Sequence, residues 1–208
     1  MWQRTAEVVL RGLNHSLSNR LTVLAGLAAE ATTTAPDGKE LGLHVEGLVQ
    51  LLHLYRALPL TATAAPEAVR VQDVMSDAVL LFAAHLEMRD VACSVHDDAV
   101  APPVLFDRAA LIQALLLLLT TAAQQLDEGA RGQGLVLRLH GEADWVHVSA
   151  ETRTPVPAVC WVETDELLAL RAMVRAAGGS VNVERDVTGV ARAHLRLATL
   201  ARLRRLGH

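Results

Sequence analysis

The 208-residue chain contains few aromatic residues and few cysteines. Three Trp, two Phe and one Tyr make up 3% of the sequence, so the hydrophobic core must be built from aliphatic side chains. Cys93 and Cys160 are far apart and form no CxxC pair, so they predict neither a disulfide framework nor a zinc site. We interpret both as reduced core residues of a cytoplasmic protein.

Long apolar runs and an excess of basic residues are also missing. The uninterrupted apolar runs, such as 78–84 and 114–119, are far shorter than the roughly 20 residues that cross a bilayer. Arg4, Glu7 and Arg11 interrupt the N-terminal region, which therefore does not resemble a secretory signal. The formal net charge of -4 gives no electrostatic footprint for nucleic acid. We expect a soluble protein with no membrane segment, no nucleic-acid partner and no sensory input domain.

Leucine recurs every three or four residues near the N-terminus. The positions are Leu10, Leu13, Leu17, Leu21, Leu24 and Leu27. This spacing predicts a long helix, from about residue 3 to residue 32, with one apolar stripe. His15 is two residues from both Leu13 and Leu17, about 200° around the helix from each, so we expect it to face solvent. Asn19 lies one turn further along the same side.

A second long helix is predicted after the turn residues Pro36 and Gly38. It runs from about residue 39 to residue 58, and its apolar side consists of Leu41, Val45, Leu48, Leu52 and Tyr55. Two long helices joined by a short turn predict an antiparallel hairpin. One hairpin has too little to pack against, so we expect two copies to form a four-helix bundle, and hence a homodimer.

Beyond a linker at 59–66, short strands alternate with helices. Strands are predicted at 69–71, 90–96, 103–106, 134–140, 145–150, 180–185 and 191–197, and helices at 72–88, 107–126 and 165–177. Asp107 is predicted to cap the second of these helices. The sequence therefore predicts an α+β protein with a helical hairpin at 1–60 and a sandwich at 67–208, in which helices cover one face of a mixed sheet.

This order of elements and three short motifs resemble the core of a sensor histidine kinase. His15-Ser16-Leu17-Ser18-Asn19 resembles the phosphoacceptor pattern, which is His, an acid, two variable residues and Asn or Thr. The sequence 111–115 resembles the start of the nucleotide-site helix, and 174–179 resembles the last helix with its Gly pair. The resemblance implies a dimerisation and phosphoacceptor hairpin followed by an ATPase-like domain.

The motifs that bind ATP in that family are altered in this sequence. The family has two Asn residues four apart on the nucleotide-site helix, and here those positions are Leu117 and Thr121. The family's Asp-Asn-Gly-Pro-Gly box resembles 151–155, where both glycines are lost and Pro155 removes an amide donor. The later Gly-x-Gly corresponds to 164–166, which places two carboxylates where triphosphate oxygens would lie.

The usual nucleotide lid is also shortened, because only residues 156–163 separate these two boxes. Together these changes predict that the chain has no cofactor and does not bind ATP. A phosphoacceptor helix that keeps His15 and Asn19 beside an altered ATP site is similar to that of histidine phosphotransferases built from degenerate kinases. The resemblance therefore implies a phosphorelay protein without ATP-dependent kinase activity.

In this interpretation, His15 takes a phosphoryl group from an aspartyl-phosphate on a response-regulator receiver domain and passes it to another receiver. The receiver supplies Mg²⁺, Asn19 positions the phosphoryl oxygens, and Arg20 neutralises them if it turns outward. A receiver that places its Asp against the imidazole also contacts the turns just beyond. We expect that docking surface to include Ser18, Thr22, Gly26 and Leu51.

Two other interpretations stay open. The family has Asp or Glu directly after the His, and Ser16 in its place would also be expected of a decayed site in a non-catalytic pseudokinase that only dimerises and docks a partner. The remaining interpretation is an active kinase with an unusual ATP site. Label transferred to His15 from a phosphorylated receiver, or from ATP, distinguishes these three functions.

Overall fold

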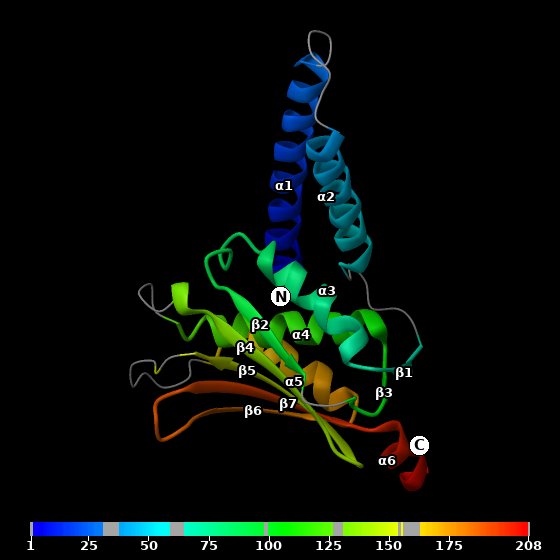
Figure 1. The fold of residues 1–208 in the computed structure, drawn as a ribbon. Helices are drawn as coiled ribbons and strands as arrows, with labels where there is room; N and C mark the ends of the chain where they lie inside the picture. Colours follow the sequence, from blue (N-terminus) through cyan, green and yellow to red (C-terminus); the bar gives the residue numbers. More distant parts are fainter. Residues whose placement is uncertain are drawn as a thin grey trace.

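The chain forms a helical hairpin that projects from an α+β body (Figure 1). The computed structural model describes residues 2–30, 38–58, 65–97, 100–126, 131–153, 155 and 163–207. The predicted turn before residue 38, most of the predicted linker, Cys160 and nearly all of the short segment 156–163 lie outside these residues. The hairpin consists of α1 (Trp2–Glu30) and α2 (Gly38–Ala57), which pack against each other.

The body alternates strands and helices in the predicted order, but its last helix, at 200–206, was not predicted, and its first strand lies two residues earlier than predicted. Its strands are β1 (Glu67–Val69), β2 (Cys93–Asp97), β3 (Val104–Phe106), β4 (Leu135–Gly141), β5 (Trp145–Thr152), β6 (Ser180–Arg185) and β7 (Ala191–Ala198). Its helices are α3 (Gln72–Ala83), α4 (Arg108–Ala123), α5 (Asp165–Ala176) and α6 (Leu200–Leu206), with a 3₁₀ turn, η1, at Arg131–Gln133. No helix in the described part of the chain is both long and apolar enough to span a membrane.

Five strands form one mixed sheet in the order β2-β4-β5-β7-β6, in which only β2 and β4 are parallel. The short strands β1 and β3 pair separately. Helix α4 packs on the sheet between α3 and α5, and its residues 110–123 are all buried. The predicted α+β class, with helices on one face of a mixed sheet, is therefore confirmed.

Capping side chains begin three of the helices. Asp107 accepts hydrogen bonds from the amides of Ala109 (2.7 Å) and Ala110 (3.3 Å), which confirms the predicted N-cap of α4. Thr164 and Thr199 cap α5 and α6 in the same way.

One predicted helix is wrong in length, because α3 ends at Ala83 and not at Met88. The chain turns instead through residues 84–91, which brings Met88, Val91 and His85 into the protein interior. The amides of His85, Met88 and Val91 each donate to the carbonyl oxygen three residues earlier, so a series of turns replaces the bonds to the fourth residue of an α-helix. His85 is only 3% exposed, and burial lowers its pKa.

The hairpin is attached to the body through a shared core. Val9 and Leu13 of α1 belong to the same cluster of buried side chains as Leu54 of α2, Leu58 just after α2, and buried residues of α3 and α4. A polar contact adds to this junction, because His53 of α2 lies 2.8 Å from the carboxylate of Asp77 on α3. The base of the hairpin is therefore part of the folded body, and the rest of it projects.

Gly12 is the point of closest approach between α1 and the end of α3. A Cβ atom added at Gly12 would lie 1.7 Å from the carbonyl oxygen of Ala84. We expect Gly12→Ala to lower the free energy of unfolding by about 1–3 kcal/mol, because two backbones must separate.

Gly42→Ala is the matched control, since nothing lies within 4 Å of the added methyl group on this exposed helical position. It should raise the free energy of unfolding by about 0.5–1 kcal/mol. Urea titrations of both variants give the comparison, and equal effects would contradict the close packing of α1 on α3.

Candidate phosphoacceptor site

His15 lies on the exposed side of α1, just beyond the part of the helix that packs on the body. The Asn19 amide nitrogen is 3.3 Å from His15 Nε2. The Asn19 amide donates to Nε2 when the ring is the neutral tautomer that carries its proton on Nδ1. The predicted pair is therefore brought together on the exposed side of α1.

The Arg20 side chain points towards α2, whereas the contact with phosphoryl oxygens considered from the sequence required it to turn outward. Its guanidinium lies against α2 at Gly47, where an added Cβ would be 2.0 Å from Nη1 and 2.1 Å from Cζ. The sequence analysis did not identify Gly47 as important. A single glycine inside a helical pattern was the available signal, because it often marks a close approach.

Three of the four residues predicted to contact a receiver are accessible. Ser18, Thr22 and Gly26 are exposed on α1, where the Thr22 hydroxyl donates to the Ser18 carbonyl oxygen at 2.9 Å. Leu51 is only 8% exposed and belongs to the core that joins the hairpin to the body. Leu51 was therefore wrongly assigned to the surface: it lies on the inner side of α2, whereas the predicted contact required the outer side.

The positions that resemble the ATP-binding helix are occupied by core residues. Leu117 is 1% exposed and Thr121 is fully buried within α4. The Thr121 hydroxyl oxygen has no hydrogen-bond partner in the described part of the chain. These two positions therefore offer neither a metal ligand nor a phosphate contact at an open surface.

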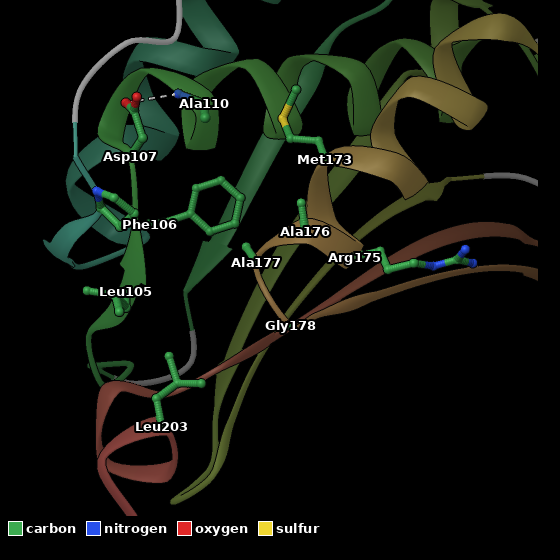
Figure 2. A pocket seen from close by; sticks show the side chains of 11 residues that line it. Leu105, Phe106, Asp107, Ala110, Met173, Arg175, Ala176, Ala177, Gly178 and Leu203 are labelled. Atoms are coloured by element: carbon green, nitrogen blue, oxygen red, sulfur yellow. Dashed lines mark hydrogen bonds between the residues drawn. The ribbon is translucent and has the colours of Figure 1, made fainter. Parts of the chain in front are cut away.

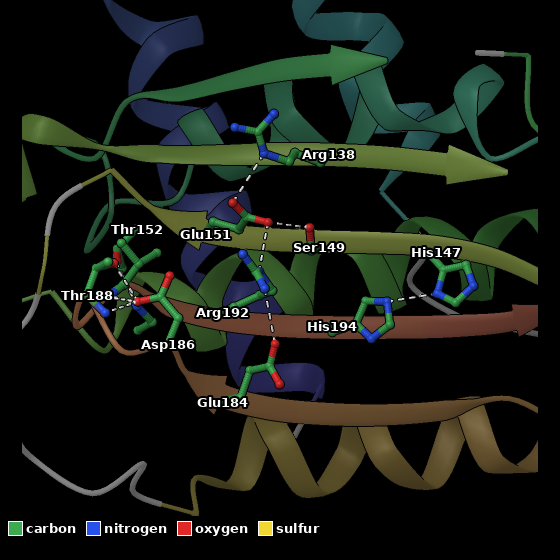
Figure 3. A network of polar contacts seen from close by, with 12 residues as sticks. Arg138, His147, Ser149, Glu151, Thr152, Glu184, Asp186, Thr188, Arg192 and His194 are labelled. Atoms are coloured by element: carbon green, nitrogen blue, oxygen red, sulfur yellow. Dashed lines mark hydrogen bonds and ion pairs between the residues drawn. The ribbon is translucent and has the colours of Figure 1, made fainter. Parts of the chain in front are cut away.

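Glu151 lies on the sheet face opposite the helices, which the sequence did not reveal (Figure 3). Its carboxylate accepts hydrogen bonds from Arg192 (2.8 Å), Ser149 (2.9 Å) and Arg138 (3.2 Å). Burial raises the pKa of Glu151, but these hydrogen bonds and the charge of Arg192 outweigh it and leave the pKa below its ordinary value. The residue that follows, Thr152, faces the helices and is 2% exposed.

The acid of the family's adenine-reading box thus has no counterpart on the helix-facing side of β5. The Thr152 hydroxyl there accepts a hydrogen bond from the Ala191 amide at 3.1 Å and so ties β5 to β7. Further on, the first turn of α5 carries Asp165 and Glu166, and its Leu167 amide donates to Thr164. Both carboxylates therefore lie at the helix end where the free backbone amides point.

A hollow of about 580 Å³ lies outside this candidate site, between the start of α4, the end of α5, β3 and α6 (Figure 2). Most of its lining is apolar, including Phe106 and Met173. Of its charged residues, Asp107 caps α4, and the Arg175 side chain points away from Phe106 (Figure 2). Among the described residues, no three His, Cys, Asp or Glu side chains are grouped to hold a metal ion.

No protein-family model and no curated protein sequence matches this chain. Solved structures do match. The chain is 18% identical to the Acinetobacter baumannii histidine kinase AdeS, with a TM-score of 0.52 over 89% of this chain and 98% of that one. It is 14% identical to the catalytic domain of histidine kinase ThkA, with a TM-score of 0.54 over 65% of this chain and 98% of that one.

A third match is ThkA in complex with the response regulator protein TrrA, at 15% identity and a TM-score of 0.51. It covers 90% of this chain and 60% of that one. At these identities the likeness concerns the fold, and it extends over both the hairpin and the body. The chain therefore has the histidine-kinase-like fold, in which a helical hairpin is followed by an ATPase-like α+β domain.

Proposed function

We propose that this chain is a phosphorelay histidine phosphotransferase that carries a phosphoryl group between receiver-domain aspartates. One observation carries the proposal, namely an exposed His15 whose Nε2 lies 3.3 Å from the Asn19 amide nitrogen on the hairpin of a histidine-kinase-like fold. The altered ATP motifs of the same chain support a donor other than ATP. An aspartyl-phosphate is such a donor, because it is already activated.

In the proposed reaction, the Nε2 lone pair of neutral His15 attacks the phosphorus of the aspartyl-phosphate. An N–P bond forms, the P–O bond to the aspartate breaks, and the electron pair leaves with the aspartate carboxylate. The Nδ1 proton stays in place, so the step needs no general base, and Ser16 in place of an acid is compatible with it. Transfer to a second receiver is the reverse reaction.

The partner receiver is proposed to supply Mg²⁺ and most of the stabilisation of the transferring group. On this chain, the Asn19 amide would move its hydrogen bond from Nε2 to a phosphoryl oxygen once Nε2 is bonded to phosphorus. The exposed residues Ser18, Thr22 and Gly26 would contact the receiver. Response-regulator receivers are proposed as partners because one structure of this fold is a complex with a response regulator.

A homodimer is part of the proposal. One side of α2 presents apolar side chains to solvent, with exposed fractions of 40% at Leu41, 48% at Val45, 61% at Val49 and 54% at Leu52. Tyr55 on this side donates a hydrogen bond to Asn14 of α1. Leu21, which is 51% exposed, is seven residues further along α1 and so lies on the Asn14 side of that helix. A second hairpin would cover this surface and complete a four-helix bundle. We call it the hairpin apolar face.

We expect Mg²⁺-ATP not to bind to the chain. Leu117 and Thr121 are buried in α4, Glu151 is on the opposite sheet face, and the first turn of α5 is acidic. Calorimetric titration with Mg²⁺-ATP should therefore give no saturable heat at concentrations where kinases of this fold are saturated. Magnesium-dependent binding in the micromolar range would overturn this expectation, and label passed from ATP to His15 would show an active kinase.

The alternative function is a non-catalytic pseudokinase that dimerises and docks a partner. Ser16 at the position of the family's acid favours it, as does the hairpin apolar face, which serves assembly whether or not His15 reacts. Incubation with a Mg²⁺-loaded, ³²P-labelled receiver separates the two functions. Acid-labile, alkali-stable label on His15 supports the phosphotransferase, whereas a receiver that binds without transfer supports the pseudokinase.

A further inference from the structure

The apolar hollow between α4, α5, β3 and α6 is a second candidate binding site. It shares no residue with the candidate phosphoacceptor site, and α6 lies at the opposite end of the body from the hairpin (Figure 1). Its volume of about 580 Å³ is typical of a binding pocket. The large apolar side chains that line it are Leu105, Phe106, Met173 and Leu203 (Figure 2). The hollow can therefore hold a bulky apolar side chain of another molecule.

Backbone and capping contacts fix the walls of this hollow. The Leu200 amide, at the start of α6, donates to the carbonyl oxygen of Pro103 just before β3 at 2.8 Å, and Thr199 caps the same helix. The carboxylate of Asp107, the one acid that lines the hollow among the described residues, is already bonded to the first amides of α4. Because the walls are held without a partner, little ordering entropy is lost when a partner binds.

The charge around the hollow is positive. Helix α6 carries Arg202, Arg204 and Arg205 and no acidic residue. Asp144 pairs with Arg202 and Arg205, whereas the Arg204 guanidinium is exposed and has no ion-pair or hydrogen-bond partner among the described residues. The same is true of Arg175, which lines the hollow at the end of α5. A chain of net charge -4 thus carries unpaired positive charge on two walls of an apolar hollow.

We infer that this hollow docks a short acidic segment of a partner protein. One bulky apolar side chain of the segment enters the hollow, and carboxylates on either side of it bind the Arg175 and Arg204 guanidiniums. An apolar anchor in a pocket with polar contacts around it is the usual arrangement at protein interfaces, and arginine binds carboxylates through paired, charge-assisted hydrogen bonds. The two arginines belong to different helices, so carboxylates spaced along a peptide fit them better than the single head group of a lipid.

The probe for this site is a dye-labelled peptide in which a central leucine is flanked by glutamates. Titration with the full chain, followed by fluorescence anisotropy, should give saturable binding that weakens as salt is added, because the rim contacts are exposed ion pairs. A peptide with serine in place of the leucine should bind about tenfold more weakly or worse, since the buried apolar group is lost. A peptide with lysines in place of the glutamates should not bind. In NMR spectra, the first peptide should shift the methyl signal of Met173, which lines the hollow.

Filling the hollow tests the apolar part of the site. Ala176 lines the hollow from α5 and is exposed, so Ala176→Phe should place a ring in it and abolish binding of the leucine peptide. Ala172→Phe is the matched control, because Ala172 is exposed one turn earlier on α5 and does not line the hollow. Thermal melting of both variants checks that the fold is retained.

Removing the rim charges tests the electrostatic part. Arg175→Ala combined with Arg204→Ala should weaken binding about tenfold, because two charge-assisted contacts are lost. Arg4→Ala combined with Arg11→Ala removes the same net charge from exposed positions of α1 that do not line the hollow, and it should leave binding unchanged. The two double variants therefore separate local contacts from the overall charge of the chain.

Several results would overturn the docking site. The leucine peptide would have to bind without saturation, or without a shift of the Met173 methyl signal, or equally well to wild type and Ala176→Phe. Equal binding by wild type and the Arg175→Ala, Arg204→Ala double variant would refute the acidic character of the segment. Binding to vesicles of phosphatidylserine, with no binding of the peptide, would refute a protein partner and indicate an anionic membrane surface. None of these results depends on phosphoryl transfer to His15.

Discussion

His15→Ala should abolish phosphoryl transfer from a phosphorylated receiver while the fold, the proposed dimer and receiver binding are retained. The substitution removes the nucleophile, and His15 is exposed and off the packing side of α1, so no core contact is lost. Quench-flow with a ³²P-labelled receiver measures the transfer, and thermal melting and sedimentation measure the fold and the assembly. Wild-type transfer rates in this variant would place the phosphoacceptor elsewhere and refute the proposal.

Neighbouring substitutions give graded controls for the same experiment. Asn19→Ala should slow transfer by about tenfold without abolishing it, since it removes one orienting hydrogen bond and not the nucleophile. Ser16→Asp should not create a kinase, because no ATP is held for the ring to attack. Larger residues at Ser18 and Thr22 should weaken receiver docking and leave stability unchanged, because both positions are exposed.

Leu52→Asp should convert the protein from a dimer to a folded monomer. Leu52 is 54% exposed in the single chain, so a carboxylate there costs the monomer little. In a four-helix bundle the same carboxylate would be buried without a partner, which costs several kcal/mol. Sedimentation velocity and circular dichroism measure mass and helix content. A dimeric Leu52→Asp variant would contradict the role of the hairpin apolar face.

Leu43→Asp is the matched control on the same helix. Leu43 is 68% exposed, but it is two residues from both Leu41 and Val45, and so it lies off the hairpin apolar face. This variant should remain dimeric with unchanged helix content. A monomeric wild-type protein at tens of micromolar would refute the homodimer itself, whatever the variants do.

Local periodicity predicted the elements of this fold except α6, a helix of only 7 residues. The leucine spacing of α1, the Asp107 cap of α4 and the Gly pair after α5 each act within a few residues of sequence, and all three occur where they were predicted. The same periodicity placed His15 and Asn19 on one side of α1 because positions four apart adjoin on any helix. These features depend on backbone geometry, which is common to all helices.

The sequence also predicted an apolar side of α2, but it could not say which apolar side faces inward. Leu51 was assigned to the surface, and tertiary packing buries it, while Leu52 beside it stays exposed. Both sides of α2 carry leucines, so the choice depends on where α3 and α1 lie. The predicted length of α3 was wrong for a related reason, since the helix ends where the following turns bring His85 and Met88 inward.

The sequence by itself thus determined the order of helices and strands up to β7, the likeness to a histidine kinase core and the exposed His15–Asn19 pair. Tertiary structure alone decided where residues distant in sequence meet. It placed Glu151 among Arg138 and Arg192 on the open face of the sheet, and it brought Arg20 over Gly47 of the other helix. Strand register and helix crossing fix such contacts, and both depend on the packing of the whole core.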